Sequence, residues 1–220
     1  MIELPDPAKS FEYENNFYLS CESSRMGKML AHYELFKMVK SVPGAIVECG
    51  VFKGVSLARF AMMRDLFGHA DTRKIIGFDT FGPFPETAFE QDKKQRDKFI
   101  QTAGPESISA AQLMEVLKRK GVDSNVELVE GDVCETVPRY VEEHPELRIS
   151  LLNLDTDIYE PAVAILKHMW PLIAKGGILM LDDYGVFPGE TKAVDEFFGA
   201  EKARIRKLPF SKTPCFIVKE

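Results

Sequence analysis

The sequence has no long hydrophobic run, because none of its apolar stretches reaches the length of about 18 residues that a membrane-spanning helix needs. Its first ten residues, MIELPDPAKS, lack the basic start and the apolar core of a secretory signal. We therefore predict a cytoplasmic protein with no membrane partner.

Cysteine pairs with metal-site spacing and an excess of positive charge are also missing. The four cysteines, Cys21, Cys49, Cys134 and Cys215, show no CxxC spacing, which favours reduced, mostly buried thiols over a zinc site or disulfides. The net charge is −6, with 28 basic and 34 acidic residues. A general nucleic-acid binder needs a basic face to neutralise phosphates, so a small molecule is the expected partner.

Internal repeats, low-complexity tracts and flexible linkers are absent, and a chain of 220 residues suits a single domain. We expect residues 1–40 to form an N-terminal helical cap or lid and residues 41–220 to form the main domain. Residues 80–108 make a connection too long for a plain turn, which is typical of a lid or binding loop. Its charged part, EQDKKQRDK, is read as the solvated face of a helix rather than an anion site.

Short apolar runs alternate with helical patterns, which predicts an α/β fold with a mostly parallel sheet and helices on both faces. The expected parallel strands are residues 44–50, 74–79, 126–132, 149–155 and 177–183. The expected helices are residues 23–39, 55–67, 109–121, 162–173 and 190–198. Residues 203–210 and 214–220 are expected to close the sheet as an antiparallel hairpin.

The predicted strand ends carry the residues of a cofactor site. Gly50 and Gly54 follow the first strand, where backbone without side chains allows close approach of a ligand. Asp79 ends the second strand and Asp132 the third, in positions that suit a ribose and a base. The pattern E-x-G-x-x-x-G lacks the GxGxxG spacing of an NAD site. Taken singly, each glycine also fits a turn and each Asp a helix cap.

Four acids follow the next two strands: Asp155, Asp157, Asp182 and Asp183. If these strands are adjacent, their ends lie about 4.8 Å apart, and carboxylates this close need a proton or a cation between them. A hard divalent ion such as Mg²⁺ fits, and we expect Asp155, Asp182 and Asp183 as its ligands. Asp157, or water through the metal, could accept the proton, and Asp155, Asp157 and Asp182 are the expected catalytic residues. The alternative for each acid is again a helix cap.

Five segments together resemble the macrocin O-methyltransferase family over residues 22–200: VECGVFKGVSL, GFDTFGPFPE, LLNLDTDIYEPAVAIL, GGILMLDDYG and AVDEFF. The resemblance implies a Rossmann-like class I methyltransferase fold with seven strands, S-adenosylmethionine as methyl donor, a magnesium ion, a sugar hydroxyl as acceptor and a homodimer. It places Glu48, Gly50, Gly54 and Ser56 around the methionine part. It places Asp79 and Thr80 at the ribose, Asp132 and Val133 at the adenine, and Asp155 beside the donor.

Three other functions stay open at this point. A catechol-type methyltransferase would use the same metal site to hold two phenolic oxygens, and only the FDTFGPFPE element argues against it. A nucleotide-binding oxidoreductase would need GxGxxG, which is absent. A non-catalytic binding module would leave four clustered acids without an explanation.

Overall fold

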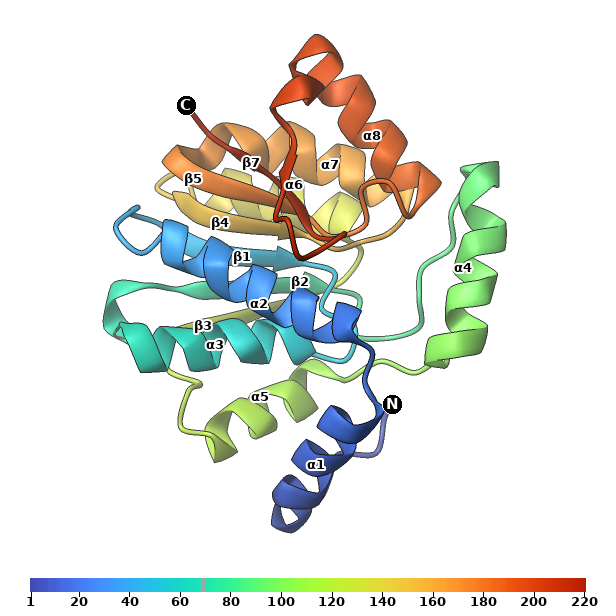
Figure 1. Cartoon of the computed structure of the whole chain (residues 1–220). Coiled ribbons are helices and arrows are strands. Elements are labelled where there is room, and N and C mark those ends of the chain that lie inside the picture. Colours follow the sequence, from blue (N-terminus) through green and yellow to red (C-terminus); the bar gives the residue numbers. More distant parts are fainter. Residues whose placement is uncertain (69) are drawn as a thin grey trace.

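The computed structural model of the chain is an α/β fold built on one seven-stranded sheet (Figure 1). It describes residues 1–68 and 70–220, and for residues 201–203 the backbone alone. The strands are β1 (Ala45–Cys49), β2 (Ile75–Asp79), β3 (Val126–Glu130), β4 (Ile149–Leu154), β5 (Ile173–Leu181), β6 (Arg206–Lys207) and β7 (Cys215–Val218). All seven lie within the segments expected from the sequence, except that β5 begins four residues earlier.

The strand order is β3-β2-β1-β4-β5-β7-β6. The first five strands are parallel, whereas β7 pairs antiparallel with β5 and β6 antiparallel with β7. The predicted Rossmann-like class I arrangement with a closing hairpin is therefore confirmed. The order reverses between β1 and β4, so the carboxyl ends of these strands form a crevice of the kind where α/β proteins bind ligands.

The strands alternate between two hydrophobic cores, because successive side chains of a strand point to opposite faces. On β1, Ile46 belongs to one core and Val47 to the other. Central strands covered on both faces need apolar residues on both, which explains their near-continuous hydrophobic runs. An acid within such a run, as at Glu48, therefore lies under a helix rather than in solvent.

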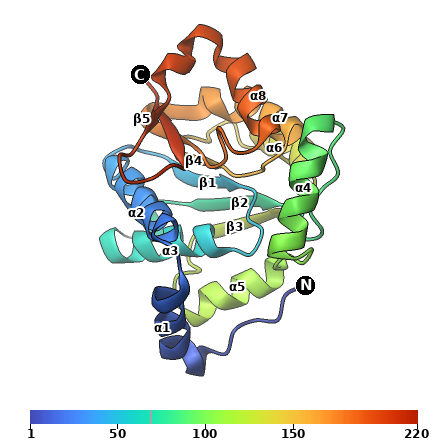
Figure 2. The same cartoon turned by 45° about the vertical axis from the view of Figure 1, so that its right-hand side comes forward.

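Helices cover both faces of the sheet (Figures 1 and 2). The helices are α1 (Ser10–Ser20), α2 (Ser23–Met38), α3 (Val55–Phe67), α4 (Glu90–Ala103), α5 (Ala110–Arg119), α6 (Val133–Glu143), α7 (Tyr159–Met169) and α8 (Pro188–Phe198). The second, third and fifth helices pack in the core that contains Ile46, whereas α6, α7 and α8 pack in the core that contains Val47. Four short 3₁₀ segments, η1 (Pro7–Lys9), η2 (Ala70–Thr72), η3 (Trp170–Leu172) and η4 (Gly199–Arg204), complete the elements.

The five helices expected from apolar spacing are present, α3 with the expected ends and the other four with ends shifted by one to four residues, and the charged stretch at residues 90–98 does form part of a helix, α4. Two helices were not expected. The sixth helix contains Pro138, which normally interrupts a helix, and begins at an Asp132 cap. The first helix has no buried residue and so gives no amphipathic signal.

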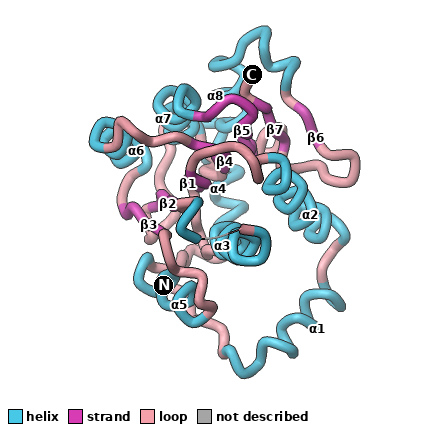
Figure 3. Tube along the Cα trace, turned by 90° about the vertical axis from the view of Figure 1, so that its left-hand side faces the viewer, coloured by secondary structure: helices cyan, strands magenta, loops and turns pink. Residues whose placement is uncertain are grey.

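The first helix projects away from the body of the molecule (Figure 3). Its exposed side chains include Phe11, Tyr18 and Leu19, which are 75%, 55% and 87% accessible. Within residues 1–68 and 70–220, we find no helix that is both long and apolar enough to cross a membrane.

Candidate active site

A cavity of about 950 Å³ opens at the carboxyl ends of the parallel strands. Ten of the residues expected in the site line it: Gly50, Ser56, Asp79, Thr80, Asp132, Val133, Asp155, Asp157, Asp182 and Asp183. The two other expected residues, Glu48 and Gly54, are not part of the lining and lie behind it. Ligand pockets of proteins span about 300–1,000 Å³, so this cavity lies at the upper end of that range.

Gly50 allows the crevice to form by letting two chain segments meet. Its φ is +92°, and a Cβ at this position would overlap the carbonyl oxygen of Asp155 and lie 2.5 Å from its carbonyl carbon. The Gly50 N–H also bonds the Phe78 carbonyl, at 2.9 Å. The glycine is thus required for the close approach of the β1 and β4 ends. Gly54 has a different task, because it precedes α3 at φ +77° and a Cβ there would lie 2.7 Å from Leu113.

Glu48 is fully buried on the face of the sheet covered by α2 and α3. One carboxyl oxygen accepts a hydrogen bond from the Ser56 hydroxyl, and the other has no partner among the described residues. Burial raises the pKa of Glu48 to about 8. The neighbouring Asn153 on β4 is also buried, and neither of its side-chain polar atoms has a partner in the described chain. Unpaired buried polar atoms behind a cavity are typical of a site completed by a ligand or water.

Asp79 and Asp132 both bond backbone N–H groups near the cavity. Asp79 accepts from Val51 at 2.6 Å, from Phe52 at 2.9 Å and from Phe81 at 2.7 Å, so it ties the turn after β1 to the end of β2. Asp132 caps α6 by accepting from the N–H of Cys134 at 2.8 Å. The cap alternative therefore holds for Asp132, although its side chain also lines the cavity.

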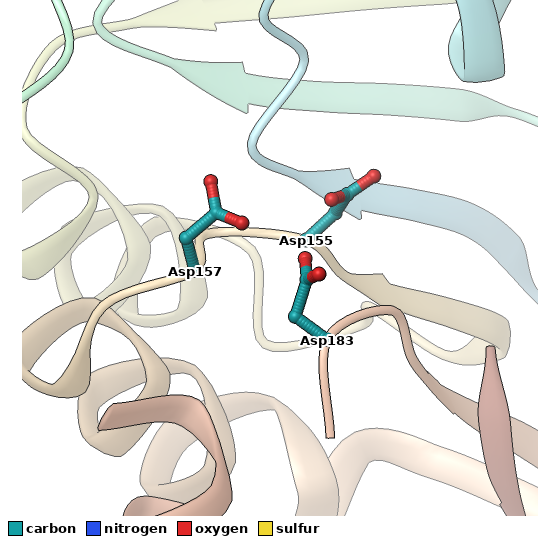
Figure 4. A group of neighbouring side chains, drawn as sticks. All are labelled: Asp155, Asp157 and Asp183. Atoms are coloured by element: carbon teal, nitrogen blue, oxygen red, sulfur yellow. The ribbon is translucent and has the colours of Figure 1, made fainter. Parts of the chain in front are cut away.

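Asp155, Asp157 and Asp183 form the acidic cluster of the site. Each offers a carboxylate oxygen, and the three oxygens lie within 4.8 Å of one another. Their side chains extend from the loops after β4 and β5 (Figure 4). Asp157 has a positive φ of 65°, a conformation that non-glycine residues rarely adopt and that is found at functional sites.

The carboxyl groups of the acidic cluster resist ionisation. Burial, followed by repulsion from Asp182, raises the pKa of Asp155 well above its usual value. Burial, followed by repulsion from Asp183, does the same for Asp157. For Asp183, burial and then repulsion from Asp182 raise the pKa to about 6. Glu190 of α8 adds a fourth buried acid, and its carboxylate accepts the N–H of Asp183 at 3.0 Å.

Asp182 is close enough to act on Asp155 and Asp183 but is not one of the three acids whose oxygens lie within 4.8 Å of one another, although the sequence suggested it as a metal ligand. One of its carboxylate oxygens accepts a hydrogen bond from the Lys28 ammonium of α2. The other lies 3.9 Å from Nε2 of His32. Burial lowers the pKa of His32 to about 3, which keeps this imidazole neutral. The structure thus differs from the sequence-based metal set by grouping Asp157, rather than Asp182, with Asp155 and Asp183.

An aromatic wall of the cavity, made by Phe52, Phe84, Phe99 and Phe187, was not identified from the sequence. Phe99 of α4 lies 5.4 Å from Phe52, 5.5 Å from Phe84 and 6.3 Å from Phe187, measured between ring centroids. All four rings line the cavity. Residues so far apart in the chain give no joint signal in a sequence, because only the fold brings them together. Residues 1–22, by contrast, contribute nothing to the lining.

Comparison with known proteins finds O-methyltransferases among the relatives of this chain. The family model for macrocin-O-methyltransferase (TylF) matches residues 21–208. One relative, from Streptomyces olivaceus, is 28% identical over 68% of this chain. It is 8-demethyl-8-(2,3-dimethoxy-alpha-L-rhamnosyl)-tetracenomycin-C 4'-O-methyltransferase. Demethyldecarbamoylnovobiocin O-methyltransferase of Streptomyces niveus is 27% identical over 71% of the chain. The chain spans only 56% and 59% of the lengths of these two relatives.

Solved structures resemble the whole chain. The crystal structure of the calicheamicin methyltransferase CalS11 superposes with a TM-score of 0.78 and 34% identity, covering 97% of this chain and 86% of that one. The O-methyltransferase NovP, at 19% identity, shares the fold with a TM-score of 0.69 over 88% of this chain and 79% of its own. The family model covers most of the chain, from α2 to the closing hairpin. The chain belongs to the macrocin-O-methyltransferase (TylF) family.

Proposed function

We propose that this protein transfers a methyl group from S-adenosylmethionine to a hydroxyl of a sugar or a glycosylated small molecule, with the help of a divalent cation. The observation that carries this proposal is the acidic cluster of Asp155, Asp157 and Asp183 at the edge of a large cavity. Family membership supports the chemistry, and the names of the relatives support the kind of acceptor.

The donor would lie across the ends of β1, β2 and β3. Gly50 leaves room beside the Asp155 backbone, and Ser56 and Glu48 lie below that point for the methionine part. Asp79 and Thr80 would face the ribose, and Asp132 and Val133 the adenine. A solved O-methyltransferase of this fold, TomG of Streptomyces achromogenes, was crystallised with S-adenosylmethionine.

The residues of the acidic cluster fit a divalent cation. Three carboxylates with oxygens within 4.8 Å supply the hard ligands that Mg²⁺ prefers. Their raised pKa values indicate that this arrangement is costly without a compensating positive charge. We therefore propose Asp155, Asp157 and Asp183 as the ligands, with Asp182 neutralised by Lys28 beside them. A cation bound there would make an acceptor hydroxyl more acidic and help to orient it.

The protein's own part in the reaction is alignment and proton transfer. A sulfonium methyl group is already reactive, so the acceptor oxygen has to be held behind it in a water-poor cavity. Lys28 bonds Asp182, and a carboxylate oxygen of Asp155 or Asp157 that the cation does not engage, or water, would receive the hydroxyl proton. The aromatic wall supplies an apolar surface on which a sugar ring can pack.

The predicted homodimer and the cytoplasmic location stay predictions. Exposed aromatic residues on the projecting α1 support association with a second copy, because such side chains rarely remain in water on a free helix. Sedimentation of the purified protein measures the assembly, and a monomer at micromolar concentration would contradict it.

Ligand binding and turnover test the proposed function. We expect S-adenosylhomocysteine to raise the melting temperature whereas NAD leaves it unchanged. With TDP-rhamnose as a probe acceptor and catechol as its competitor, we expect methylation of the sugar and loss of turnover in EDTA. TDP-rhamnose is chosen because CalS11, one of the solved relatives, is a TDP-rhamnose 3'-O-methyltransferase. Stabilisation by NAD but not by S-adenosylhomocysteine would overturn the proposed methyl transfer. Full activity in EDTA would overturn the proposed need for a divalent cation.

A further inference from the structure

The segment of residues 80–103, which carries part of the aromatic wall, is joined to the acidic cluster by two buried carboxylates. The first is Asp92 of α4, which is fully buried. One of its oxygens accepts the N–H of Tyr159 at 3.0 Å, and the other accepts the N–H of Gly189 at 2.7 Å. Tyr159 is the first residue of α7 and Gly189 the second of α8. One side chain therefore binds the positive ends of two other helices.

The second carboxylate makes the same kind of contact in the opposite direction. Glu160 of α7 accepts hydrogen bonds from the Thr87 hydroxyl at 3.0 Å and from the N–H groups of Ala88 and Phe89 at 2.9 and 3.1 Å. Phe89 is the residue immediately before α4. Asp92 and Glu160 thus form a reciprocal clamp, in which each helix supplies an acid to the beginning of the other.

The backbone is shaped around this clamp. A Cβ on Gly189 would overlap an Asp92 carboxylate oxygen and lie 2.5 Å from the Tyr159 nitrogen. Burial raises the pKa of the Asp92 carboxyl, and the two N–H donors act in the opposite direction because they stabilise its charge. A glycine at this position is needed for the carboxylate to reach both helices.

The clamped helices begin where the acidic cluster ends. Asp157 lies two residues before α7, and its carbonyl accepts the N–H of Glu190 in α8 at 3.3 Å. Glu190 in turn accepts the N–H of Asp183. A displacement of either helix start therefore moves the carboxylates that face the acceptor, and a misplacement of about 1 Å in such a site is enough to cost about a hundredfold in rate.

We propose that Asp92 and Glu160 are positioning residues that hold the 80–103 wall against the acidic cluster and so fix the acceptor side of the cavity. This role deepens the function proposed above and rests on it. The clamp acts through the starts of α7 and α8, whereas the residues proposed for the methyl donor belong mainly to the ends of β1, β2 and β3.

The test compares Asp92→Asn with Asp97→Asn. The second variant is a matched control, because Asp97 is on the same helix with a side chain that is 66% exposed. An amide at position 92 keeps the shape and one acceptor oxygen, but its NH₂ group faces the second of the two backbone N–H groups and leaves it without an acceptor. We expect hydrogen exchange of residues 84–103, 157–160 and 186–190 to accelerate by about tenfold or more. We also expect Mg²⁺ to bind at least about fivefold more weakly by calorimetry, with S-adenosylhomocysteine affinity within about twofold.

Asp97→Asn should match the parent in hydrogen exchange, Mg²⁺ binding and S-adenosylhomocysteine binding. If Asp92→Asn does not fold, Glu160→Gln, which alters the other carboxylate of the clamp, should give the same faster exchange and weaker Mg²⁺ binding. Faster exchange confined to α4, with Mg²⁺ binding unchanged, would overturn the inference. If the parent protein binds no Mg²⁺, the metal of the proposed function is refuted. The clamp is then tested by hydrogen exchange alone: faster exchange of residues 157–160 and 186–190 in Asp92→Asn supports it, and unchanged exchange there overturns it.

Discussion

Replacing Gly50 by Ala tests whether the crevice depends on close contact between the ends of β1 and β4. The added methyl group meets two obstacles. The residue has φ +92°, a conformation that costs a non-glycine residue about 1–3 kcal/mol. The methyl group also overlaps the carbonyl oxygen of Asp155, and relieving such a clash by backbone movement costs about 1–3 kcal/mol more.

Gly121→Ala separates the two contributions. Gly121 also has a positive φ, +69°, but a Cβ there would meet nothing within 4 Å. This control therefore carries the backbone cost without the clash. The difference between the two variants should be about 1–3 kcal/mol, which in a protein of this size corresponds to a difference in melting temperature of about 2–12 °C.

Calorimetric or fluorescence melting of both variants measures this difference, and titration with S-adenosylhomocysteine shows whether the donor side is displaced. We expect Gly50→Ala to melt below Gly121→Ala and to bind the ligand more weakly, because Asp155 moves with its carbonyl. Equal melting temperatures for the two variants would refute the reasoning that a backbone contact, rather than φ alone, selects glycine at position 50.

Two further predictions concern buried charges. Arg64 is 2% exposed and donates to four backbone carbonyl oxygens. Because a lysine ammonium has only three N–H groups, Arg64→Lys should remove at least one of these bonds and lower the free energy of unfolding in urea by about 1–3 kcal/mol; an unchanged midpoint would contradict this. Burial raises the pKa of Glu48 from 4.5 to about 8, and repulsion from Asp182 adds to this effect. The Ser56 hydrogen bond and the charges of Lys28 and Arg59 act in the opposite direction. The native state thus keeps a proton that the unfolded chain releases, and stability falls by up to about 1.4 kcal/mol per unit as pH rises from about 5 to 8. Glu48→Gln should flatten this dependence, and parallel curves for both proteins would refute it.

The fold was predictable because its signals are local. Each parallel strand ends in an acid or is directly followed by Gly or an acid, and α3 shows apolar spacing over the whole of Val55–Phe67. The sequence analysis did not predict the sixth helix, whose local signals conflict, because the cap at Asp132 favours a helix and Pro138 disfavours one. Its burial of Val137 and Tyr140 in the core stabilises the helix in spite of the proline, and this contribution is visible only in the tertiary structure.

The site was predictable at the strand ends and unpredictable beyond them. Parallel strands bring their carboxyl ends to one edge, so Gly50, Asp79 and Asp155 had to lie near one another once the sheet was inferred. Whether Asp157 or Asp182 is the third proposed metal ligand depends on the directions of their side chains. It also depends on Lys28, which bonds Asp182 from more than 150 positions away in the sequence. Likewise, Asp92 sits in a stretch that reads as a solvated helix face, and only the starts of α7 and α8 make it a buried ligand of backbone N–H groups.

The distribution of charge in the site links its stability to its chemistry. Lys28 bonds Asp182, and its single charge also acts on Asp155 and Asp183, so the four acids Asp155, Asp157, Asp183 and Glu190 still form an excess that burial forces toward protonation. A fold optimised only for stability would replace such a group with apolar side chains, because unpaired buried acids destabilise the native state. Its presence beside a cavity is therefore best explained by a positive partner that the folded protein acquires from solution, and binding of that partner to the native state alone stabilises the fold.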